Sequence, residues 1–297
     1  MNGSTFLNRT IRLAERKHDV PGGGWVDGKA ERPSNREVAS HSVERRNREF
    51  RSLCKPLAKH HHFLFCKLVA WFPMMRVVNI SDAVRVSAKR TQSRGEELAN
   101  SISHGIGLCA ALIGAPILLL EARRSSPGFF LGTVIFVVTM SMLYLGSTLY
   151  HAWPQRRGKS ILQVADHSAI FLLIAGTYTP FTLGPLRGFW GSTMLALVWA
   201  LAIFGVFLKT TRGPARHPKL SMTLYLGTGW LALIAARPMT LAIPFPALFW
   251  LVAGGIAYTT GVLFFVNQRL RYAHFIWHLF VLAGTSCHFA AIFFCAA

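Results

Sequence analysis

Residues 129–153 read FFLGTVIFVVTMSMLYLGSTLYHAW and carry no Asp, Glu, Lys or Arg. A transmembrane α-helix needs roughly 20 apolar residues to cross a hydrocarbon core about 30 Å thick. This segment is long enough and apolar enough to do so. We therefore predict that it spans a membrane.

Similar apolar segments recur on both sides of it. We expect seven spanning helices, at about residues 100–121, 129–153, 161–183, 189–208, 220–236, 245–266 and 272–295. The fifth gives the weakest signal because it is short and ends at Arg237, although Pro238 to Ile243 could continue it as an apolar connection. The predicted fold class is an all-α membrane protein, a bundle of seven transmembrane helices.

The distribution of charge supports this prediction. The net charge is +20, but eight of the twelve acidic residues and 19 of the 32 basic residues lie in the first 95 positions. Beyond Glu121 the only acid is Asp166. A water-soluble surface needs far more charge than this, so a soluble enzyme is excluded. The basic residues form no patch on a packed domain, so we expect membrane lipids and no nucleic acid as partners.

The basic residues also predict the orientation. Besides the tail, the second, fourth and sixth loops hold Arg156, Arg157, Lys159, Lys209, Arg212, Arg216, Lys219, Arg269 and Arg271. The alternate loops hold only Arg123, Arg124, Arg187 and Arg237. Because basic loops stay in the cytoplasm, we expect a cytoplasmic N-terminus, a C-terminus outside, and contacts of the basic loops with anionic headgroups. The expected location is the cell membrane, which is the inner membrane in a Gram-negative host.

Residues 1–95 differ in character from the rest. They are rich in Pro, Gly, Ser and mixed charge, so we expect a basic, largely disordered tail. Its apolar stretch at 63–75 is too short to span a bilayer, and an interfacial or buried helix is expected there. One hypothesis places the native start near Met74 or Met75. Residues 96–297 form the predicted seven-helix domain.

The five cysteines include no CxxC pair, and we expect them to be unpaired.

Ionisable residues within the predicted spans are the candidates for chemistry, because burying them in a bilayer is costly. His274 and His278 are spaced i, i+4, which places both imidazoles on one helix face and suits a shared metal ion. His151 ends the second span, and Asp166 lies roughly 7 to 8 Å into the third at 1.5 Å per residue. In the charge-based orientation these four residues share one depth at the cytoplasmic side.

Three histidines with an open fourth position are typical of a catalytic zinc site. Asp166 would hold the zinc-bound water or act as general base, and Ser147, one turn before His151, would bind that water or orient substrate. Simpler interpretations remain open. The histidines could bond to headgroups, Asp166 could bond to a neighbouring helix, and Ser147 could bond back to its own helix.

The other histidines of the spans are weaker candidates for ligands. His104 lies near the start of the first span and could contact the metal ligands without binding the metal itself. His167 points about 100° away from Asp166 around the helix. His288 lies roughly 15 Å beyond His278 along the axis, which is too far for a shared ion.

Four motifs in this order resemble the hemolysin III branch of the seven-helix progestin and adiponectin receptor family. They are EELANSISHGIG from Glu96, LGSTLYH ending at His151, VADHSAIFLLIAGTYTPF around Asp166, and HFIWH from His274. The resemblance covers about residues 95–295 and departs from bacterial-type members in the long tail. It implies a seven-helix bundle with a cytoplasmic N-terminus. It also implies a zinc site near the inner face, formed by Ser147, His151, Asp166, His274 and His278.

The function expected from these features is zinc-dependent hydrolysis of a lipid amide or ester at the cytoplasmic side, since the resemblance implies a ceramidase-like activity. The alternative is a non-enzymatic membrane protein with a structural metal. Such a protein would act in membrane homeostasis, in receptor-like sensing, or as a membrane-perturbing cytolysin. An ion conductor is disfavoured because a single carboxylate makes a poor proton relay.

Overall fold

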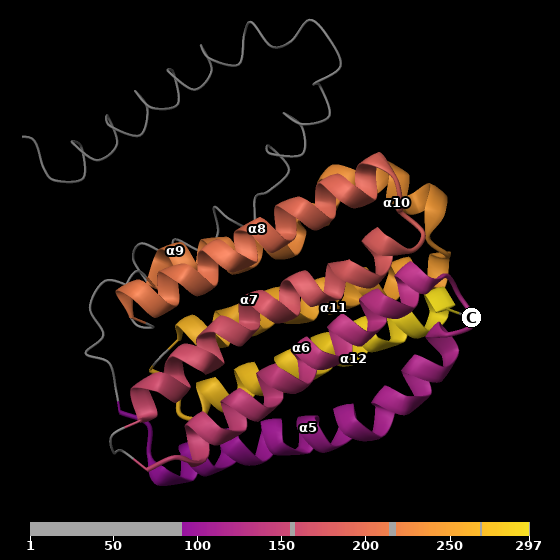
Figure 1. The fold of residues 1–297 in the computed structure, drawn as a ribbon. Coiled ribbons are helices and arrows are strands. Elements are labelled where there is room, and N and C mark those ends of the chain that lie inside the picture. The colour runs from indigo at the N-terminus through magenta and orange to yellow at the C-terminus, as the bar shows by residue number, and fades with distance from the viewer. Residues whose placement is uncertain (1–90, 155–157, 214–217, 268, 297) are drawn as a thin grey trace, which may run out of the picture. The chain divides into compact units, whose positions relative to one another are not determined.

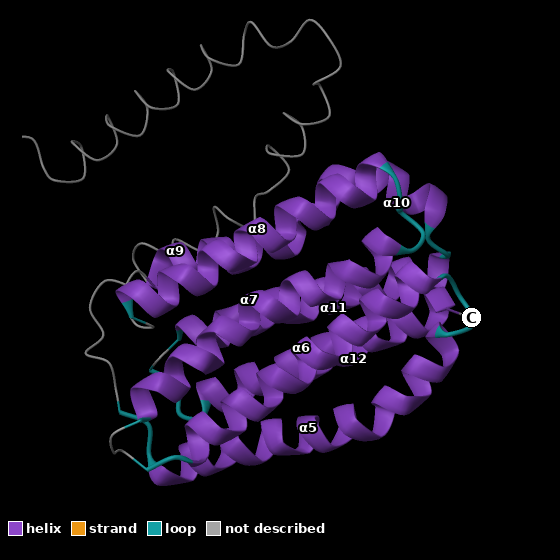
Figure 2. Cartoon of the chain, viewed as in Figure 1, coloured by secondary structure: helices purple, strands orange, loops and turns teal. Residues whose placement is uncertain are grey.

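The computed structural model describes residues 91–154, 158–213, 218–267 and 269–296, and these residues form helices and loops without a strand (Figures 1 and 2). The helices are α5 (Arg94–Ala122), α6 (Pro127–Ala152), α7 (Lys159–Leu183), α8 (Phe189–Arg212), α9 (Pro218–Gly229), a 3-10 helix η2 (Trp230–Ala235), α10 (Ala236–Ala242), α11 (Phe245–Val266) and α12 (Ala273–Ala296). With α9 to α10 counted as one span, seven segments of the described chain are long and apolar enough to cross a membrane. The predicted fold class is confirmed.

Some expected features lie outside the described residues. They are most of the 1–95 tail with its apolar stretch at 63–75, the charges of Arg156, Arg157 and Arg216, and Cys54 and Cys66. Cys109, Cys287 and Cys295 are free, as expected. The orientation in the membrane stays a prediction.

The first span begins at Arg94, earlier than hydrophobicity alone indicated, because Ser93 and Glu96 form a capping box. The Ser93 hydroxyl accepts a hydrogen bond from the Glu96 backbone N–H at 3.3 Å, and the Glu96 carboxylate accepts one from the Ser93 N–H at 2.9 Å. These bonds satisfy backbone donors that a helix start leaves free. The extra turn carries two acids, Glu96 and Glu97, into the bundle.

The fifth span is interrupted, which explains its weak signal. It changes from α-helix to 3-10 helix at Trp230 and then continues as α10 to Ala242. The Tyr178 hydroxyl lies 3.0 and 2.8 Å from the carbonyl oxygens of Thr228 and Gly229 and accepts a bond from the Ala232 N–H at 2.9 Å. A side chain thus replaces part of the backbone hydrogen bonding, as non-helical backbone in a membrane requires.

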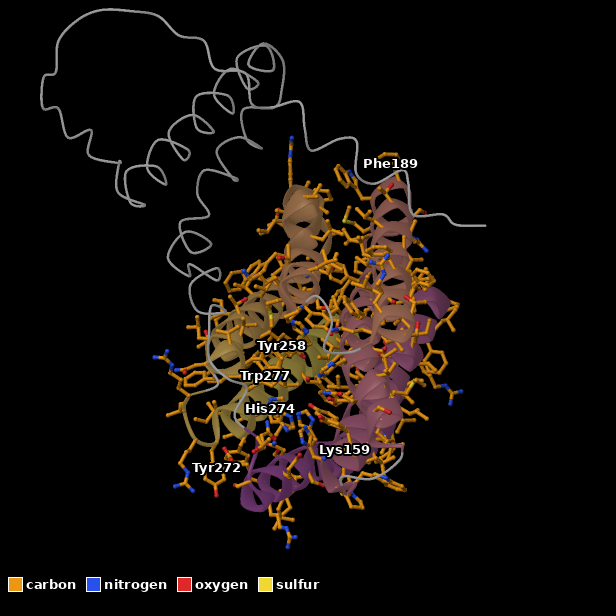
Figure 3. The ribbon with its side chains drawn as sticks, turned by 90° about the vertical axis from the view of Figure 1, so that its left-hand side faces the viewer. Lys159, Phe189, Tyr258, Tyr272, His274 and Trp277 are labelled. Atoms are coloured by element: carbon orange, nitrogen blue, oxygen red, sulfur yellow. The ribbon has the colours of Figure 1, made fainter. Side chains whose placement is uncertain are left out.

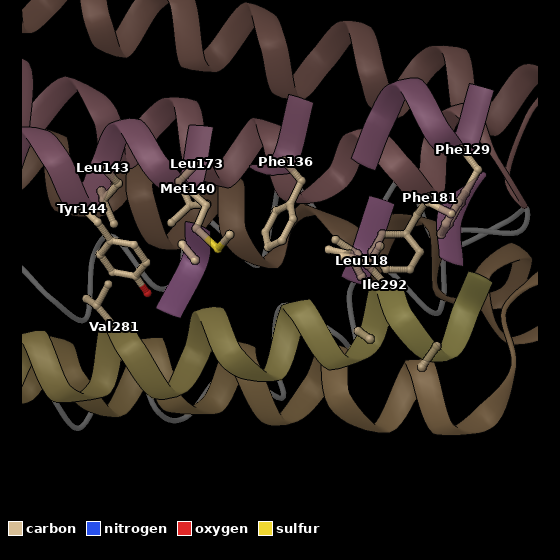
Figure 4. Close-up of a cluster of buried hydrophobic side chains, with 14 of the residues drawn as sticks. Leu118, Phe129, Phe136, Met140, Leu143, Tyr144, Leu173, Phe181, Val281 and Ile292 are labelled. Atoms are coloured by element: carbon tan, nitrogen blue, oxygen red, sulfur yellow. The ribbon is translucent and has the colours of Figure 1, made fainter. Parts of the chain in front are cut away.

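The most extensive helix contacts join α6 to α7, α11 to α12 and α5 to α6, and α12 also packs against α5. Gly132 of α6 allows a close approach to α7, because a Cβ atom there would lie 2.5 Å from the Pro180 Cα. Small residues at such crossings are common in membrane bundles. Apolar side chains of α6 and α12, including Phe136 and Val281, fill a shared core (Figure 4).

Short connections make successive helices run in alternating directions (Figure 1). As a result, one end of the bundle collects the start of α5, the end of α6, the start of α7 and the start of α12. We call this the histidine end, since His151 and His274 lie there. Large apolar side chains such as Ile113, which is 72% exposed, cover the outer faces and suit contact with lipid.

Candidate metal centre

Three histidines meet at the histidine end. The ligand nitrogens of His151, His274 and His278 all lie within 4.8 Å of one another, close enough to hold one metal ion. The ring centroids are 5.1 Å apart for His151 and each of the other two, and 4.7 Å apart for His274 and His278. Figure 3 shows His274 on the side of the bundle where Lys159 and Tyr272 lie, far from Phe189.

The helical geometry explains this meeting. His274 and His278 are one turn apart near the start of α12, so they face the same way. His151 comes from the last turn of α6, which runs in the opposite direction. His151 and His278 are buried, with 4% and 2% of their surface exposed. The expected convergence of the end of α6 with the start of α12 is thus present in the structure.

The nitrogen atoms of these rings fit a metal site. The Nδ1 of His151 lies 2.6 Å from a carboxylate oxygen of Glu97, whereas its Nε2 is buried and has no hydrogen-bond partner among the described residues. The Nδ1 of His278 lies 3.1 Å from the Ser103 hydroxyl and 3.2 Å from the Asn100 carbonyl oxygen. Metal-bound histidines usually have the second ring nitrogen held in this way. The donor set therefore suits a metal ion that accepts imidazole ligands.

Asp166 and Ser147 lie beside the three histidines but outside the group whose ligand atoms converge. Both are buried, with 8% and 1% exposed. The Asp166 carboxyl group lies near Ser147 and His151, and the buried Ser147 hydroxyl makes no hydrogen bond within the described residues. This placement suits groups that act on a molecule bound at the metal, and their roles stay predictions.

A cavity of about 330 Å³ leads away from the histidines. His274, His278, Ser147 and Asp166 line one end, and Leu186 and Met194 line the other. Along α7 the lining extends from Asp166 to Thr182, a helical rise of roughly 24 Å. The wall between is mainly apolar and comes from α7, α9, η2, α11 and α12. A long apolar cavity with a few polar groups at one end suits a ligand with an acyl chain.

The remaining histidines of the spans lie outside the group of three whose nitrogens converge. His104 is buried and packs against the His278 ring, which agrees with the supporting position expected for it. His167 lines the cavity together with Asp166. His288 also lines the cavity, with its Nε2 3.3 Å from the Leu251 carbonyl oxygen.

Two contacts at the site were not anticipated from the sequence. Glu97 joins His151 to Lys159, whose Nζ donates to the second carboxylate oxygen at 3.0 Å. Glu96 accepts a hydrogen bond from the Tyr272 N–H at 2.9 Å and so holds the start of α12. The sequence does contain one feature that could have indicated these contacts, which is the scarcity of acidic residues. Only Glu96, Glu97, Glu121 and Asp166 follow residue 95, and an acid in such a chain needs a partner.

Comparison with known proteins gives a consistent result. Residues 92–289 match the model of a family described as "Haemolysin-III related". The chain is 42% identical to the "Hemolysin-3 homolog" of Bacillus subtilis (strain 168) over 201 residues, which are 67% of this chain and 92% of the relative. It is 40% identical to "Hemolysin-3" of Bacillus cereus over 207 residues, which are 69% of this chain and 94% of the relative. A more distant similarity, 27% over 212 residues, links it to the human "Monocyte to macrophage differentiation factor", with 66% of this chain and 83% of the relative covered.

Proposed function

Since this chain belongs to the haemolysin-III related family and is a multi-pass cell-membrane protein, we propose that it is a zinc-dependent hydrolase of a lipid amide or ester. The single observation that carries the proposal is the apolar cavity that ends at three convergent histidines with Ser147 and Asp166 beside them. The excess of basic residues in alternate loops supports a position of this site at the cytoplasmic side of the bilayer.

Three histidines leave a fourth position of a tetrahedral metal ion available to water or substrate. A zinc ion held there would polarise an acyl carbonyl and make water acidic enough to attack near neutral pH. Imidazole ligands suit several metals, and zinc is preferred because of the family resemblance and the three-histidine donor set.

The chain's own residues supply the remaining steps. An acyl chain enters the apolar cavity and brings the carbonyl carbon to the polar end, where Asp166 and Ser147 lie. A carboxylate oxygen of Asp166 takes the proton from the attacking water and returns it to the departing amine or alcohol. The Ser147 hydroxyl, one turn from His151, orients that water.

The alternative is a structural metal in a non-enzymatic membrane protein, including a cytolysin. A structural zinc site is closed by four protein ligands. Here the convergent group among the described residues has three members, and the cavity reaches two of them, His274 and His278. These features favour the hydrolase.

The test uses the detergent-purified full chain with a panel of ceramides and other acyl lipids, as wild type, His278→Ala and Asp166→Asn. We expect released fatty acid from the wild type only. The His278 variant should lose metal, and the Asp166 variant should keep it. Wild type that holds zinc but cleaves none of the lipids would contradict the hydrolase and leave the structural metal.

A further inference from the structure

We propose that Glu97 is a positioning residue of the metal centre. Glu97 fixes the tautomer and the orientation of His151, and Lys159 holds Glu97 in place. The inference rests on the proposed metal site. It goes beyond the five residues that the family resemblance implies, because Glu97 comes from α5, a helix that supplies none of the three convergent histidines.

The first step is the hydrogen bond. A Glu97 carboxylate oxygen lies 2.6 Å from Nδ1 of His151, and the His151 side chain is 1% exposed. An ionised carboxylate can only accept hydrogen bonds, and its contact is much shorter than the 3.5 Å between the Asn100 side-chain nitrogen and the same Nδ1, so Nδ1 carries the hydrogen. In a neutral imidazole the lone pair then resides on Nε2. Glu97 thereby selects Nε2, the buried nitrogen that has no hydrogen-bond partner in the described part of the chain, as the metal ligand.

The second step is the anchor of Glu97 itself. The other carboxylate oxygen accepts a hydrogen bond from Lys159 Nζ at 3.0 Å, and the same Nζ donates to the Trp153 carbonyl oxygen at 3.2 Å. Lys159 also lies over the Tyr150 ring, 5.0 Å from its centroid. Both oxygens of the carboxylate are therefore engaged, and its position relative to His151 is defined by α6 and α7 together.

The third step is electrostatic. A carboxylate behind a metal-bound imidazole raises the basicity of that ligand and stabilises the positive charge of the metal complex. Loss of such a partner typically weakens metal affinity about 10- to 100-fold. The alternative is that these contacts only hold α5 against α6 and α7. A positioning role and a purely structural role predict different results.

The experiment measures the dissociation constant of Zn²⁺ by chelator competition on the full chain in detergent, together with the Co²⁺ absorption spectrum at saturation. Glu97→Gln and Glu97→Ala are compared with His151→Ala. Glu121→Gln is the matched control, since it removes the same charge from the far end of α5, where Glu121 pairs only with the exposed Arg124 in the described structure. Helix content and monodispersity verify the fold.

We expect both Glu97 variants to bind Zn²⁺ about 10- to 100-fold more weakly. Their Co²⁺ spectra should change even when the site is full, whereas Glu121→Gln should match wild type. If Glu97 only held α5 against α6 and α7, its substitution would leave the Co²⁺ spectrum of the saturated site unchanged, and that result would overturn the inference. If Glu97→Ala misfolds, Glu97→Gln alone decides.

The outcomes separate this inference from the proposed function. Loss of metal in His151→Ala with wild-type affinity in Glu97→Gln would overturn the role of Glu97 and keep the metal centre. No metal in wild type, or wild-type affinity in His151→Ala, would overturn both.

Discussion

The imidazole rings of His104 and His278 lie parallel, with their centroids 3.6 Å apart and an angle of 9° between their planes. His104 also makes an edge contact with the Tyr144 ring, with the two ring centroids 5.3 Å apart. His278 is thus held from two directions, by this stacking and by the contacts of its Nδ1 with Ser103 and Asn100. A ligand fixed in this way needs little reorganisation when a metal binds.

We therefore predict that His104 supports the ligand His278 and does not itself bind the metal. We expect His104→Phe, which preserves a flat ring, to retain one metal ion per chain, and His104→Ala to bind it more weakly. Metal analysis and chelator competition measure both effects. Complete loss of metal from His104→Phe at saturating Zn²⁺ would indicate that His104 is itself a ligand.

The role proposed for Asp166 can be separated experimentally from metal binding. Asp166→Asn keeps the size of the side chain but cannot take a proton, so we expect the metal content of wild type and a turnover lowered about 10²- to 10⁴-fold. The rate of lipid hydrolysis, measured on metal-replete protein, tests this. Turnover within a factor of two of wild type would remove Asp166 from the mechanism.

The cavity should set the length of acyl chain that the protein accepts. Gly255 lines the cavity beside Trp230, where a Cβ atom would lie 3.5 Å from the indole ring. We expect Gly255→Phe to lower kcat/KM about tenfold or more for long acyl chains, with less effect on short ones and none on metal content. Gly227→Phe is the control for adding a large side chain elsewhere. Gly227 does not line the cavity, and a Cβ atom there would meet no described atom within 4 Å. Equal losses for both chain lengths would argue against an acyl site.

The contact between α6 and α7 should depend on Gly132. Gly132→Ala places a Cβ against the Pro180 backbone, so we expect a loss of about 1 to 3 kcal/mol in stability from overpacking. Gly227→Ala should instead be neutral or stabilising, because alanine favours the helix and no atom opposes it. Thermal unfolding in detergent compares the two, and a Gly132→Ala protein as stable as Gly227→Ala would show that the close approach is unimportant.

Much of the fold could be predicted from the sequence because spanning helices leave a strong local signal. Runs such as 245–266 carry no charged residue and are mainly apolar, and the helix found there has the same bounds. The break at Trp230 could not be predicted, since it depends on the Tyr178 hydroxyl from another helix.

The convergence of His151 with His274 and His278 could also be anticipated, because alternating helix directions place the end of α6 and the start of α12 at the same depth. Glu97 could not be assigned in this way. Its partner is 54 residues away, and depth alone does not reveal which side chains of neighbouring helices touch. The roles of Ser147 and Asp166 depend on a bound molecule and remain predictions.

The central claim is that three histidines of this bundle hold one metal ion, and metal content per purified chain tests it most directly. We expect about one zinc ion in the wild type and none in His278→Ala, with the helix content of both proteins the same. No metal in the wild type, or the same content in both proteins, would contradict the claim and reduce the histidine end to a structural polar network.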